Sequence, residues 1–300
     1  MPNVRNIIAS RLVRTYPFYT GCGTFANSRL VRLISGDSNE VGWGKVDGGY
    51  QVAAPLDDYV GRAIYFAGDL DPKVTWVCKR LVRHGDTVLD IGANLGLVTF
   101  VLSALVGPGG RVHAFEPIPR MQALITAAIE RNAVKNVKLH RCALGSEQGT
   151  LGLSVPDDHA GKASFLAERG VARAHTIPVP VARLSDILDV ERPGPVRLVK
   201  IDVEGFEPQV LEGAVEWFSR QPPDAILFEL NDKRSAMRDS RTVQILEGLG
   251  YHFFALPKRF MSMRLRRIAV DDARPNDAHD FLALHKTKDS SEMHARLGAS

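Results

Sequence analysis

The chain has 300 residues, 45% of them hydrophobic, so it is long enough to bury one large core in one or two domains. Its three cysteines, Cys22, Cys78 and Cys142, are scattered and odd in number, which excludes a disulfide framework and a C-x-x-C metal pair and favours the reducing cytoplasm. The net charge is only +4, and no apolar run reaches the roughly 18 residues that a membrane-spanning helix requires.

The first predicted element is a basic N-terminal extension over residues 1–58. Residues 1–36 contain no acidic side chain but five arginines: Arg5, Arg11, Arg14, Arg29 and Arg32. Apolar residues (Val4, Ile7, Ile8 and Leu12) recur at helical spacing, so we expect an amphipathic helix that packs against the rest of the chain. A second acid-free run, residues 258–267, adds further basic side chains. Such clusters suit contact with phosphate or an anionic membrane, although a solvated basic surface is the simpler interpretation.

A tight strand-to-helix turn carries the first candidate binding residues. Thr87–Ile91 is a short apolar run typical of a buried strand, and Leu97–Val106 is an apolar helix that follows it closely. The turn between them lies at the carboxyl end of a strand, where parallel sheets bind ligands and where unpaired N–H groups are expected. The residues predicted to face the ligand are Asp90, Gly92, Asn94 and Gly96.

A second acidic signal ends the next strand and indicates the kind of ligand. Arg111–Phe115 reads as that strand and is followed by Glu116, about 20 residues beyond the turn, where an acid accepts both hydroxyls of a ribose. A dinucleotide site has the pattern G-x-G-x-x-G, but Asn94 replaces the middle glycine and would obstruct a diphosphate. S-adenosylmethionine, an amino acid joined to an adenosine without phosphate, fits these groups better than NAD does.

Strands and helices alternate along the remainder, as in a doubly wound sheet. We expect a helix over residues 121–129, a strand at 137–139, a paired excursion of 150–155 with 176–181, a strand at Val196–Ile201, a helix over 205–217, a strand at 225–230, a helix over 234–249 closed by Gly250, and strands at 251–254 and Asp280–His285. The tail, residues 288–300, is expected to fray.

Three charged residues surround the end of the strand Val196–Ile201: Lys200, Asp202 and Glu204. They alternate in sequence, so all three share one face if the strand continues. Methyl transfer from a sulfonium requires alignment of the acceptor and removal of its proton, and a carboxylate can perform the second task. We predict Asp202 as the general base, Glu204 as the group that orients substrate or cofactor amine, and Lys200 as their partner. The alternative is that these charges only neutralise each other at a strand end.

A metal-assisted reaction is a second interpretation of the same strand ends. Glu229, Asn231 and Asp232 follow the next strand, and with Asp202 they would offer the oxygen ligands that Mg²⁺ prefers. Strand alternation sends Asp232 to the opposite face from Glu229 and Asn231, so no residue is assigned as a metal ligand. His159, in the loop of residues 156–175, is an alternative base or ligand.

The chain resembles the FkbM family of S-adenosylmethionine-dependent methyltransferases in six ordered motifs: IYFAGDLDP (64–72), VLDIGANLG (88–96), HAFEPIP (113–119), CALG (142–145), KIDVEGFE (200–207) and ILFEL (226–230). The resemblance implies a Rossmann-like class I methyltransferase domain over residues 59–287. Its sheet would be doubly wound, α/β, seven-stranded and mostly parallel, with an antiparallel last strand. The resemblance also implies that Pro117 and Ala143 belong to the cofactor site.

The sequence therefore predicts an S-adenosylmethionine-dependent O-methyltransferase. The acceptor implied by the resemblance is a hydroxyl of a sugar, a polysaccharide precursor, or a glycosylated or polyketide metabolite. A macromolecule methyltransferase acting on RNA or protein, and a non-catalytic cofactor-binding protein, are the alternatives. The basic clusters contain few aromatic side chains for base stacking, so we expect no nucleic-acid partner.

Overall fold

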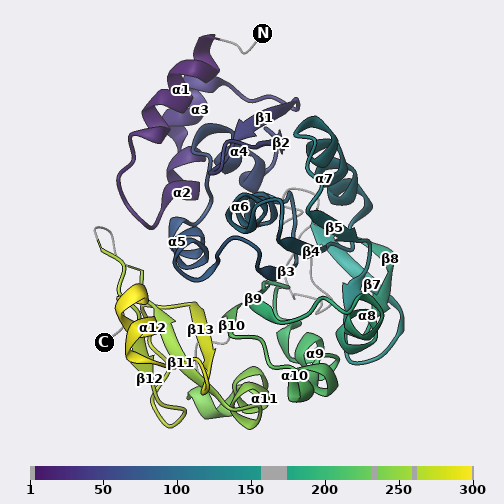
Figure 1. The fold of residues 1–300 in the computed structure, drawn as a ribbon. Helices are drawn as coiled ribbons and strands as arrows, with labels where there is room; N and C mark the ends of the chain where they lie inside the picture. Colours follow the sequence, from purple (N-terminus) through teal and green to yellow (C-terminus); the bar gives the residue numbers. More distant parts are fainter. Residues whose placement is uncertain (1–3, 157–173, 231–235, 259–261, 299–300) are drawn as a thin grey trace.

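The computed structural model describes residues 4–156, 174–230, 236–258 and 262–298, and a mixed sheet of eight strands lies at the centre of this part of the chain (Figure 1). The strands lie in the order β12-β11-β13-β10-β9-β3-β4-β5. Their bounds are β3 (Thr87–Ile91), β4 (Arg111–Phe115), β5 (Val137–His140), β9 (Val196–Ile201), β10 (Ala225–Glu229), β11 (Tyr251–Leu256), β12 (Arg266–Ile268) and β13 (Asp280–His285).

The strand directions confirm the predicted fold class. The sheet is parallel from β5 to β10, and β13 is inserted antiparallel between β10 and β11. Seven strands follow the expected arrangement, and the short β12 adds an eighth at the edge that the sequence did not indicate. The chain runs outward from β3 to β5 and then restarts at β9 on the other side of β3. This reversal is the switch point at which α/β sheets form their binding crevices.

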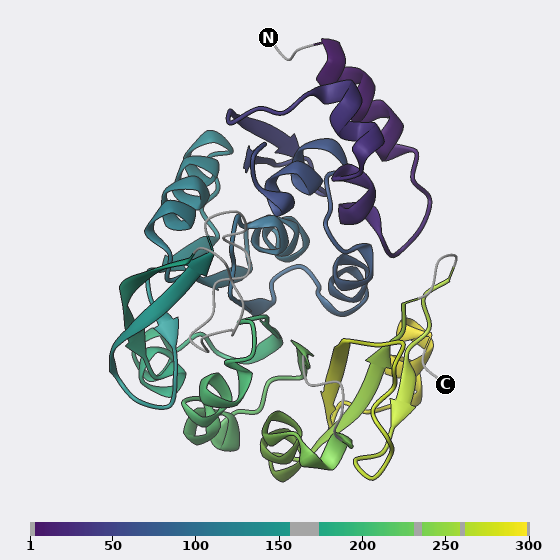
Figure 2. The ribbon, with the colours of Figure 1, turned by 180° about the vertical axis from the view of Figure 1, so that it is seen from behind.

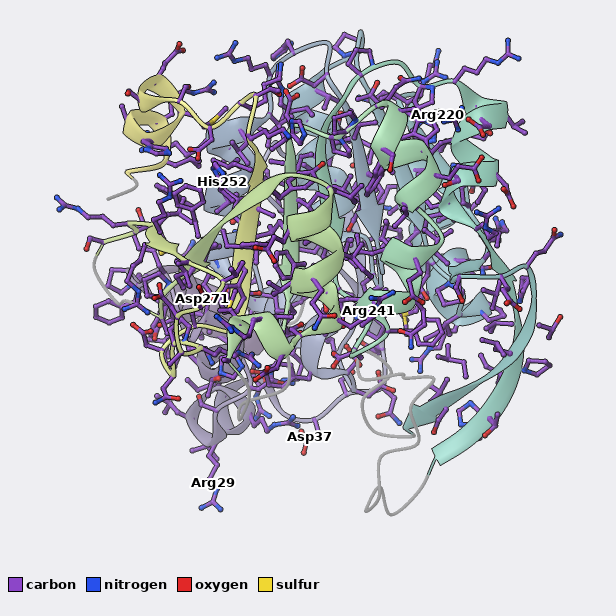
Figure 3. The ribbon with its side chains drawn as sticks, turned by 90° about the horizontal axis from the view of Figure 1, so that it is seen from below. Arg29, Asp37, Arg220, Arg241, His252 and Asp271 are labelled. Carbon is purple, nitrogen blue, oxygen red and sulfur yellow. The ribbon has the colours of Figure 1, made fainter. Side chains whose placement is uncertain are left out.

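Helices cover both faces of the sheet (Figures 1 and 2). Successive strand residues point to opposite faces, and those of the two faces pack with the helices in two separate apolar clusters. Leu89 and Ile91 pack with α8 (Leu184–Glu191), α9 (Glu207–Glu212), α10 (Val215–Arg220) and α11 (Arg241–Gly248). Val88 packs with α5 (Pro72–Leu81), α6 (Leu97–Val106) and α12 (Ser291–Leu297), and α7 (Pro119–Arg131) packs on Ala114 of β4. Charged side chains such as Arg220 and Arg241 project from this core (Figure 3).

An N-terminal layer packs outside the central sheet, and α4 forms its inner part. It consists of α1 (Val4–Arg14), α2 (Cys22–Ala26), α3 (Arg29–Ser35), the hairpin of β1 (Val41–Lys45) and β2 (Gln51–Pro55), and α4 (Tyr59–Phe66). Helix α1 packs against the rest of the chain as expected, but through Ala9 and Val13. Val4, Ile7 and Ile8, which were expected to form the packing face, are exposed.

A small three-stranded sheet flanks the main one. Its strands are β6 (Ala143–Leu144), β7 (Gly149–Pro156) and β8 (Ala174–Ala182), in the order β6-β8-β7. The antiparallel pairing of β7 with β8 is the predicted excursion. Because β6 pairs with β8, this sheet holds Ala143 beside the end of β5.

The helix expected over residues 205–217 is divided into α9 and α10. In an unbroken helix the N–H of Trp217 would donate to the carbonyl of Gly213. That carbonyl instead accepts the N–H of Ser185 at 3.0 Å, and the Trp217 N–H donates to Ser185 Oγ at 3.1 Å. The contact with α8 therefore interrupts the helical ladder.

Two predictions near the C-terminus also differ from the structure. The helix expected from residue 234 begins at Arg241, after the 3₁₀ turn η2 (Met237–Asp239), while residues 231–235 lie outside the described part. The expected frayed tail contains α12, which Ser290 caps and which buries Met293 and Leu297. In the part of the chain that the structure describes, every helix is too short or too polar to cross a membrane.

Candidate functional site

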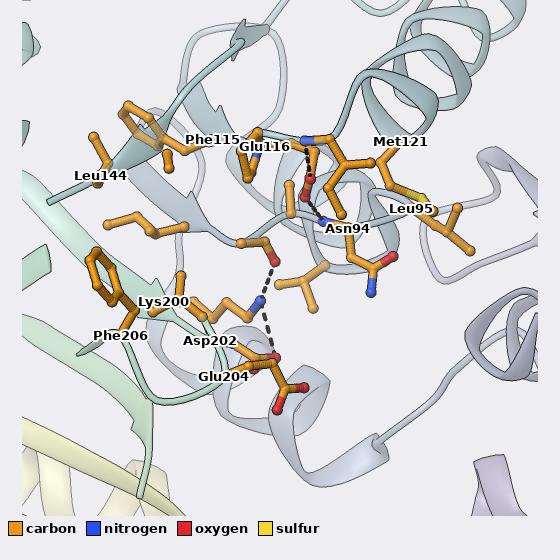
Figure 4. Close-up of a pocket in the computed structure, with 18 of the residues that line it drawn as sticks. Asn94, Leu95, Phe115, Glu116, Met121, Leu144, Lys200, Asp202, Glu204 and Phe206 are labelled. Atoms are coloured by element: carbon orange, nitrogen blue, oxygen red, sulfur yellow. Dashed lines mark hydrogen bonds and ion pairs between the residues drawn. The ribbon is translucent and has the colours of Figure 1, made fainter. Parts of the chain in front are cut away.

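A pocket opens at the switch point, where the turns after β3, β4 and β9 meet (Figure 4). Eight of the ten predicted site residues line it: Gly92, Asn94, Glu116, Pro117, Ala143, Lys200, Asp202 and Glu204. Asp90 and Gly96 do not line it. The sequence motifs thus converge on one cavity although they are far apart in the chain.

The turns after β3 and β9 are in direct contact. Gly92 has a φ of 78°, and a Cβ added there would lie 1.9 Å from the carbonyl oxygen of Asp202. The N–H of Asp202 in turn donates to the carbonyl of Ile91 at 3.1 Å. Only glycine fits at position 92, and the two turns form one unit.

The N–H groups at the start of the β3 turn are not free, contrary to the expectation from sequence. Those of Gly92 and Ala93 donate to the carbonyl of Phe115 at 3.1 and 3.0 Å, and that of Asn94 donates to Glu116 Oε2 at 2.7 Å. A diphosphate needs such groups as donors. This part of the turn therefore offers no cradle for a dinucleotide.

Glu116 is fixed in the pocket wall with its side chain almost fully buried. Besides the bond from Asn94, its Oε1 accepts the N–H of Ile118 at 2.9 Å (Figure 4). Burial raises the pKa of Glu116 to about 7, and the bonds from Ile118 and Asn94 oppose this rise. Each carboxylate oxygen accepts two hydrogen bonds, so Glu116 keeps acceptor capacity for hydroxyls.

Lys200 lines the pocket and links the turn after β3 to the turn after β9. Its ammonium donates to the carbonyl of Gly92 at 2.9 Å and lies 3.4 Å from Asp90 Oδ1 and 3.4 Å from Asp202 Oδ2. Burial alone would lower the pKa of Lys200, but the charges of Asp202 and Asp90 outweigh burial and raise it. Lys200 is therefore a permanently charged positioning residue.

Asp90 lies behind the pocket wall instead of pointing at the ligand. It is fully buried, and its Oδ2 accepts the hydroxyl of Thr99 in α6 at 2.5 Å. The alternation of strand residues places Asp90 on the α6 face, which the sequence pattern did not reveal. Asp90 acts on the pocket through Lys200.

Asp202 and Glu204 are presented by a turn, because β9 ends at Ile201. Glu204 and Gly205 both have positive φ, at 51° and 95°, and the carboxylate of Glu207 accepts the N–H groups of Val203 and Gly205 at 3.2 Å each. A non-glycine residue in this conformation is strained, so the contacts of Glu207 hold the turn in a shape that Glu204 alone would disfavour. Glu207 was not predicted as a site residue, although it lies within the KIDVEGFE motif.

The rest of the pocket wall is apolar and was not predicted. Its side chains come from the β3 turn, α7, the small sheet and the start of α9: Leu95, Ile118, Met121, Leu144, Leu153 and Phe206. Val60 and Leu70 join them from α4 and the segment after it. Such residues resemble ordinary core positions in a sequence. Five of them lie in the quoted motifs, but none was singled out as a site residue: Leu70, Leu95, Ile118, Leu144 and Phe206.

Comparison with known proteins identifies the family. Residues 90–253 match the family model described as the Methyltransferase FkbM domain. This chain belongs to the FkbM methyltransferase family. It is accordingly an S-adenosylmethionine-dependent methyltransferase.

Two relatives illustrate the similarity. This chain is 31% identical over 198 residues to "31-O-demethyl-FK506 methyltransferase FkbM" from Streptomyces tacrolimicus. The alignment covers 57% of this chain and 74% of the relative. It is 29% identical over 183 residues to "Methyltransferase 1" of Beauveria bassiana, which covers 55% of this chain and 71% of the relative. A crystal structure of methyltransferase FkbM from Methylobacillus flagellatus KT aligns with a TM-score of 0.41 at 15% identity, over 94% of this chain and 59% of that one.

The pocket of this FkbM methyltransferase suits S-adenosylmethionine. The cofactor has ribose hydroxyls, a flat adenine and no phosphate. The Glu116 carboxylate lies in the pocket wall with acceptor capacity that hydroxyls can use, and the apolar wall can enclose a flat ring. The paired N–H groups of Gly92, Ala93 and Asn94 are compatible with a ligand that lacks a diphosphate.

The residues considered as metal ligands do not form a metal site within the described ranges. There, no three His, Cys, Asp or Glu side chains are grouped so as to hold a metal ion. Burial, together with the charges of Asp202 and Asp280, raises the pKa of Glu229 to about 8, so this carboxyl is mostly protonated at neutral pH. Asn231, Asp232 and His159 lie outside the described residues.

Proposed function

We propose that this FkbM methyltransferase methylates a hydroxyl group of a sugar, a polysaccharide precursor, or a glycosylated or polyketide metabolite. One observation carries the proposal. The Asp202 carboxylate lines the pocket at the end of β9, with 46% of its side chain exposed, and Lys200 holds one of its oxygens. A hydroxyl attacks poorly until it loses its proton, and Asp202 is placed to accept that proton.

The roles of the other residues follow from their positions. S-adenosylmethionine, when bound, supplies a methyl carbon already activated by a sulfonium. Asp202 would accept the proton of the acceptor hydroxyl as the methyl group passes from sulfur to oxygen and the neutral thioether leaves, and Lys200 keeps the carboxylate in place. Glu204, on the same turn, orients the acceptor or the amine of the cofactor. Glu116 accepts hydrogen bonds from the ribose, and Lys200 couples Asp202 to the cofactor turn.

The acceptor class rests on the family and on the surface charges. The Streptomyces relative is named for 31-O-demethyl-FK506, a small molecule methylated on oxygen. Two arginines of the C-terminal basic segment are less available to a nucleic acid, because Arg266 pairs with Asp277 at 2.8 Å and Arg267 lies 3.5 Å from Asp289. We therefore favour a small-molecule or glycan acceptor over RNA.

The acceptor can be found by incubating the pure protein with methyl-labelled cofactor and fractionated cell extract. Mass spectrometry of the labelled product then shows which atom carries the methyl group. Label on the oxygen of a sugar or polyketide supports the proposal. Label confined to RNA, protein or a nitrogen atom contradicts it.

Asp202→Asn tests the role of the base. The amide keeps the shape of the side chain but cannot accept a proton at neutral pH, so turnover should fall by about 10² to 10⁴. Cofactor affinity, measured by calorimetry, should change little. Glu212→Gln, on the surface of α9, is the matched control. Normal turnover in Asp202→Asn would remove Asp202 from the mechanism.

A further inference from the structure

Exposed apolar side chains are concentrated on two helices of the N-terminal layer. Eight large apolar side chains are exposed in the described part of the chain, and five of them lie on α1 and α3: Val4 (69%), Ile7 (40%), Ile8 (53%), Leu30 (52%) and Leu33 (82%). The other three, Val41, Leu151 and Val190, are in separate elements. Clustered exposure of this kind indicates an interaction surface, whereas single exposed residues do not.

The two helices expose these residues on a common outer side. Ala9 and Val13 of α1 and Val31 of α3 are buried in one cluster with Ala63 and Phe66 of α4. Helices α1 and α3 also contact each other, and Figures 1 and 2 show them side by side at the N-terminal end of the molecule. Since their inner sides rest on α4, their opposite sides form one surface, which we call the α1–α3 face.

Arginines are interspersed with the apolar residues on the α1–α3 face. Arg11 follows Ile7 by one helical turn, and Arg29 precedes Leu33 by the same spacing, so each pair shares a helix side. Both arginines are exposed, and Arg29 projects from the molecule in Figure 3. Residues 1–36 contain no acid. Asp37, just beyond α3, pairs with Arg32 at 3.0 Å. An apolar surface whose charges are mainly positive matches the interface of a membrane that contains anionic lipids.

We propose that the α1–α3 face docks this methyltransferase on an anionic membrane surface, with Ile7, Ile8 and Leu33 entering the headgroup region. A second copy of the chain is a poorer occupant. A two-fold contact brings the α1–α3 faces of two copies together, so the positive charges of both copies would be gathered in one interface with no acid from residues 1–36 to neutralise them. Anionic lipid headgroups neutralise these charges.

Docking would place the enzyme on the surface that carries lipid-linked acceptors, a step that rests on the proposed function. Helix α4, on which α1 and α3 rest, supplies Val60 to the pocket wall, and Leu70 lies on the same wall. The α1–α3 face and the pocket thus share one supporting helix. A hydroxyl on a glycolipid or lipid-linked sugar is the acceptor class that this arrangement favours.

Vesicle sedimentation of the full chain tests the docking without any turnover. The probes are vesicles of phosphatidylcholine alone and of phosphatidylcholine with about one-third phosphatidylglycerol. We expect binding to the second kind only, weakened about fivefold for each arginine removed in Arg11→Ser and Arg29→Ser. The triple variant Ile7→Ser, Ile8→Ser, Leu33→Ser should lose binding by at least tenfold. A control pair, Leu151→Ser and Val190→Ser, should bind as the parent does.

Vesicle binding can fail without any change in the methylation reaction, so the two proposals are tested separately. Failure of the parent to bind anionic vesicles, or unchanged binding in the triple variant, would overturn the membrane proposal. Analytical ultracentrifugation showing a parent dimer that the triple variant abolishes would assign the α1–α3 face to a second copy and also overturn it. Cofactor affinity measured by calorimetry should be the same in all these variants, which verifies their fold. The identity of the methylated product tests the reaction separately.

Discussion

Because we propose that Glu116 binds the ribose, we expect its protonation state to control cofactor affinity. Burial raises its pKa to about 7, and only the ionised carboxylate accepts hydrogen bonds from both ribose hydroxyls. Cofactor binding should therefore tighten as the pH rises through 7, by about tenfold between pH 6 and pH 8. Calorimetry across this range measures the effect, and Glu116→Gln should bind more weakly and show a flat profile. An equally steep profile in Glu116→Gln would assign the titration to another group.

Lys200 neutralises a fully buried aspartate, so its removal should destabilise the fold. Lys200→Met leaves Asp90 buried next to Thr99 without a cation, and breaking a buried pair in this way costs about 3 to 5 kcal/mol. Urea denaturation gives the loss in free energy of unfolding. The double variant Asp90→Asn, Lys200→Met should recover part of that loss, because position 90 then carries no charge that lacks a partner. Equal stability of the single and double variants would show that the pair is not coupled.

The acids of the site could be predicted from sequence, while their environment could not. Glu116 and Asp202 each follow an apolar strand, and that position alone places them at the carboxyl edge of the sheet. The orientation of Asp90 depends on which helix covers each face of β3. The hydrogen bonds from the N–H groups of the β3 turn to the Phe115 carbonyl and the Glu116 carboxylate depend on tertiary contacts. The sequence placed Lys200 with Asp202 and Glu204, but it did not indicate the ion pair between Lys200 and Asp90.

At the scale of elements, the contact between the turns after β3 and β9 makes Gly92 irreplaceable. A Cβ at this position meets the Asp202 carbonyl, and the positive φ adds strain. Gly92→Ala should therefore cost about 2 to 5 kcal/mol of stability and abolish cofactor binding. Gly109→Ala is the matched control, because a Cβ there meets nothing within 4 Å. Comparable losses in both variants would contradict the proposed clash.

Elements with local signals were predicted, and elements defined by distant contacts were not. The strands β3, β4, β9 and β13 have the predicted bounds because each is a short apolar run between turn residues. The break between α9 and α10 depends on Ser185, which is far away in the sequence. Helix α12 is polar apart from Met293 and Leu297, and burial against the α5 side of the sheet orders it. Tertiary packing overrode weak local preference in both cases.

At the scale of the whole molecule, cofactor binding should stabilise the fold selectively. A ligand present at about 100 times its Kd adds about 2.7 kcal/mol to the free energy of unfolding, if only the folded state binds it. S-adenosylmethionine should raise the thermal midpoint in this way, whereas NAD should not, because the N–H groups of Gly92, Ala93 and Asn94 are already bonded within the protein and cannot hold its diphosphate. Thermal melts with each compound provide the comparison. A larger shift with NAD would contradict the cofactor assignment.

The place of β13 in the sheet has a consequence for biosynthesis. This strand fills the gap between β10 and β11, and both of those neighbours are complete in the chain before it is made. Until residues 280–285 leave the ribosome, β10 has an open edge, and β11 with β12 has no attachment to the sheet. Open edges of this kind favour aggregation. The nascent protein therefore passes through a stage at which the parallel strands β3 to β10 can already pair, while β11 and β12 join the sheet only after β13 is made.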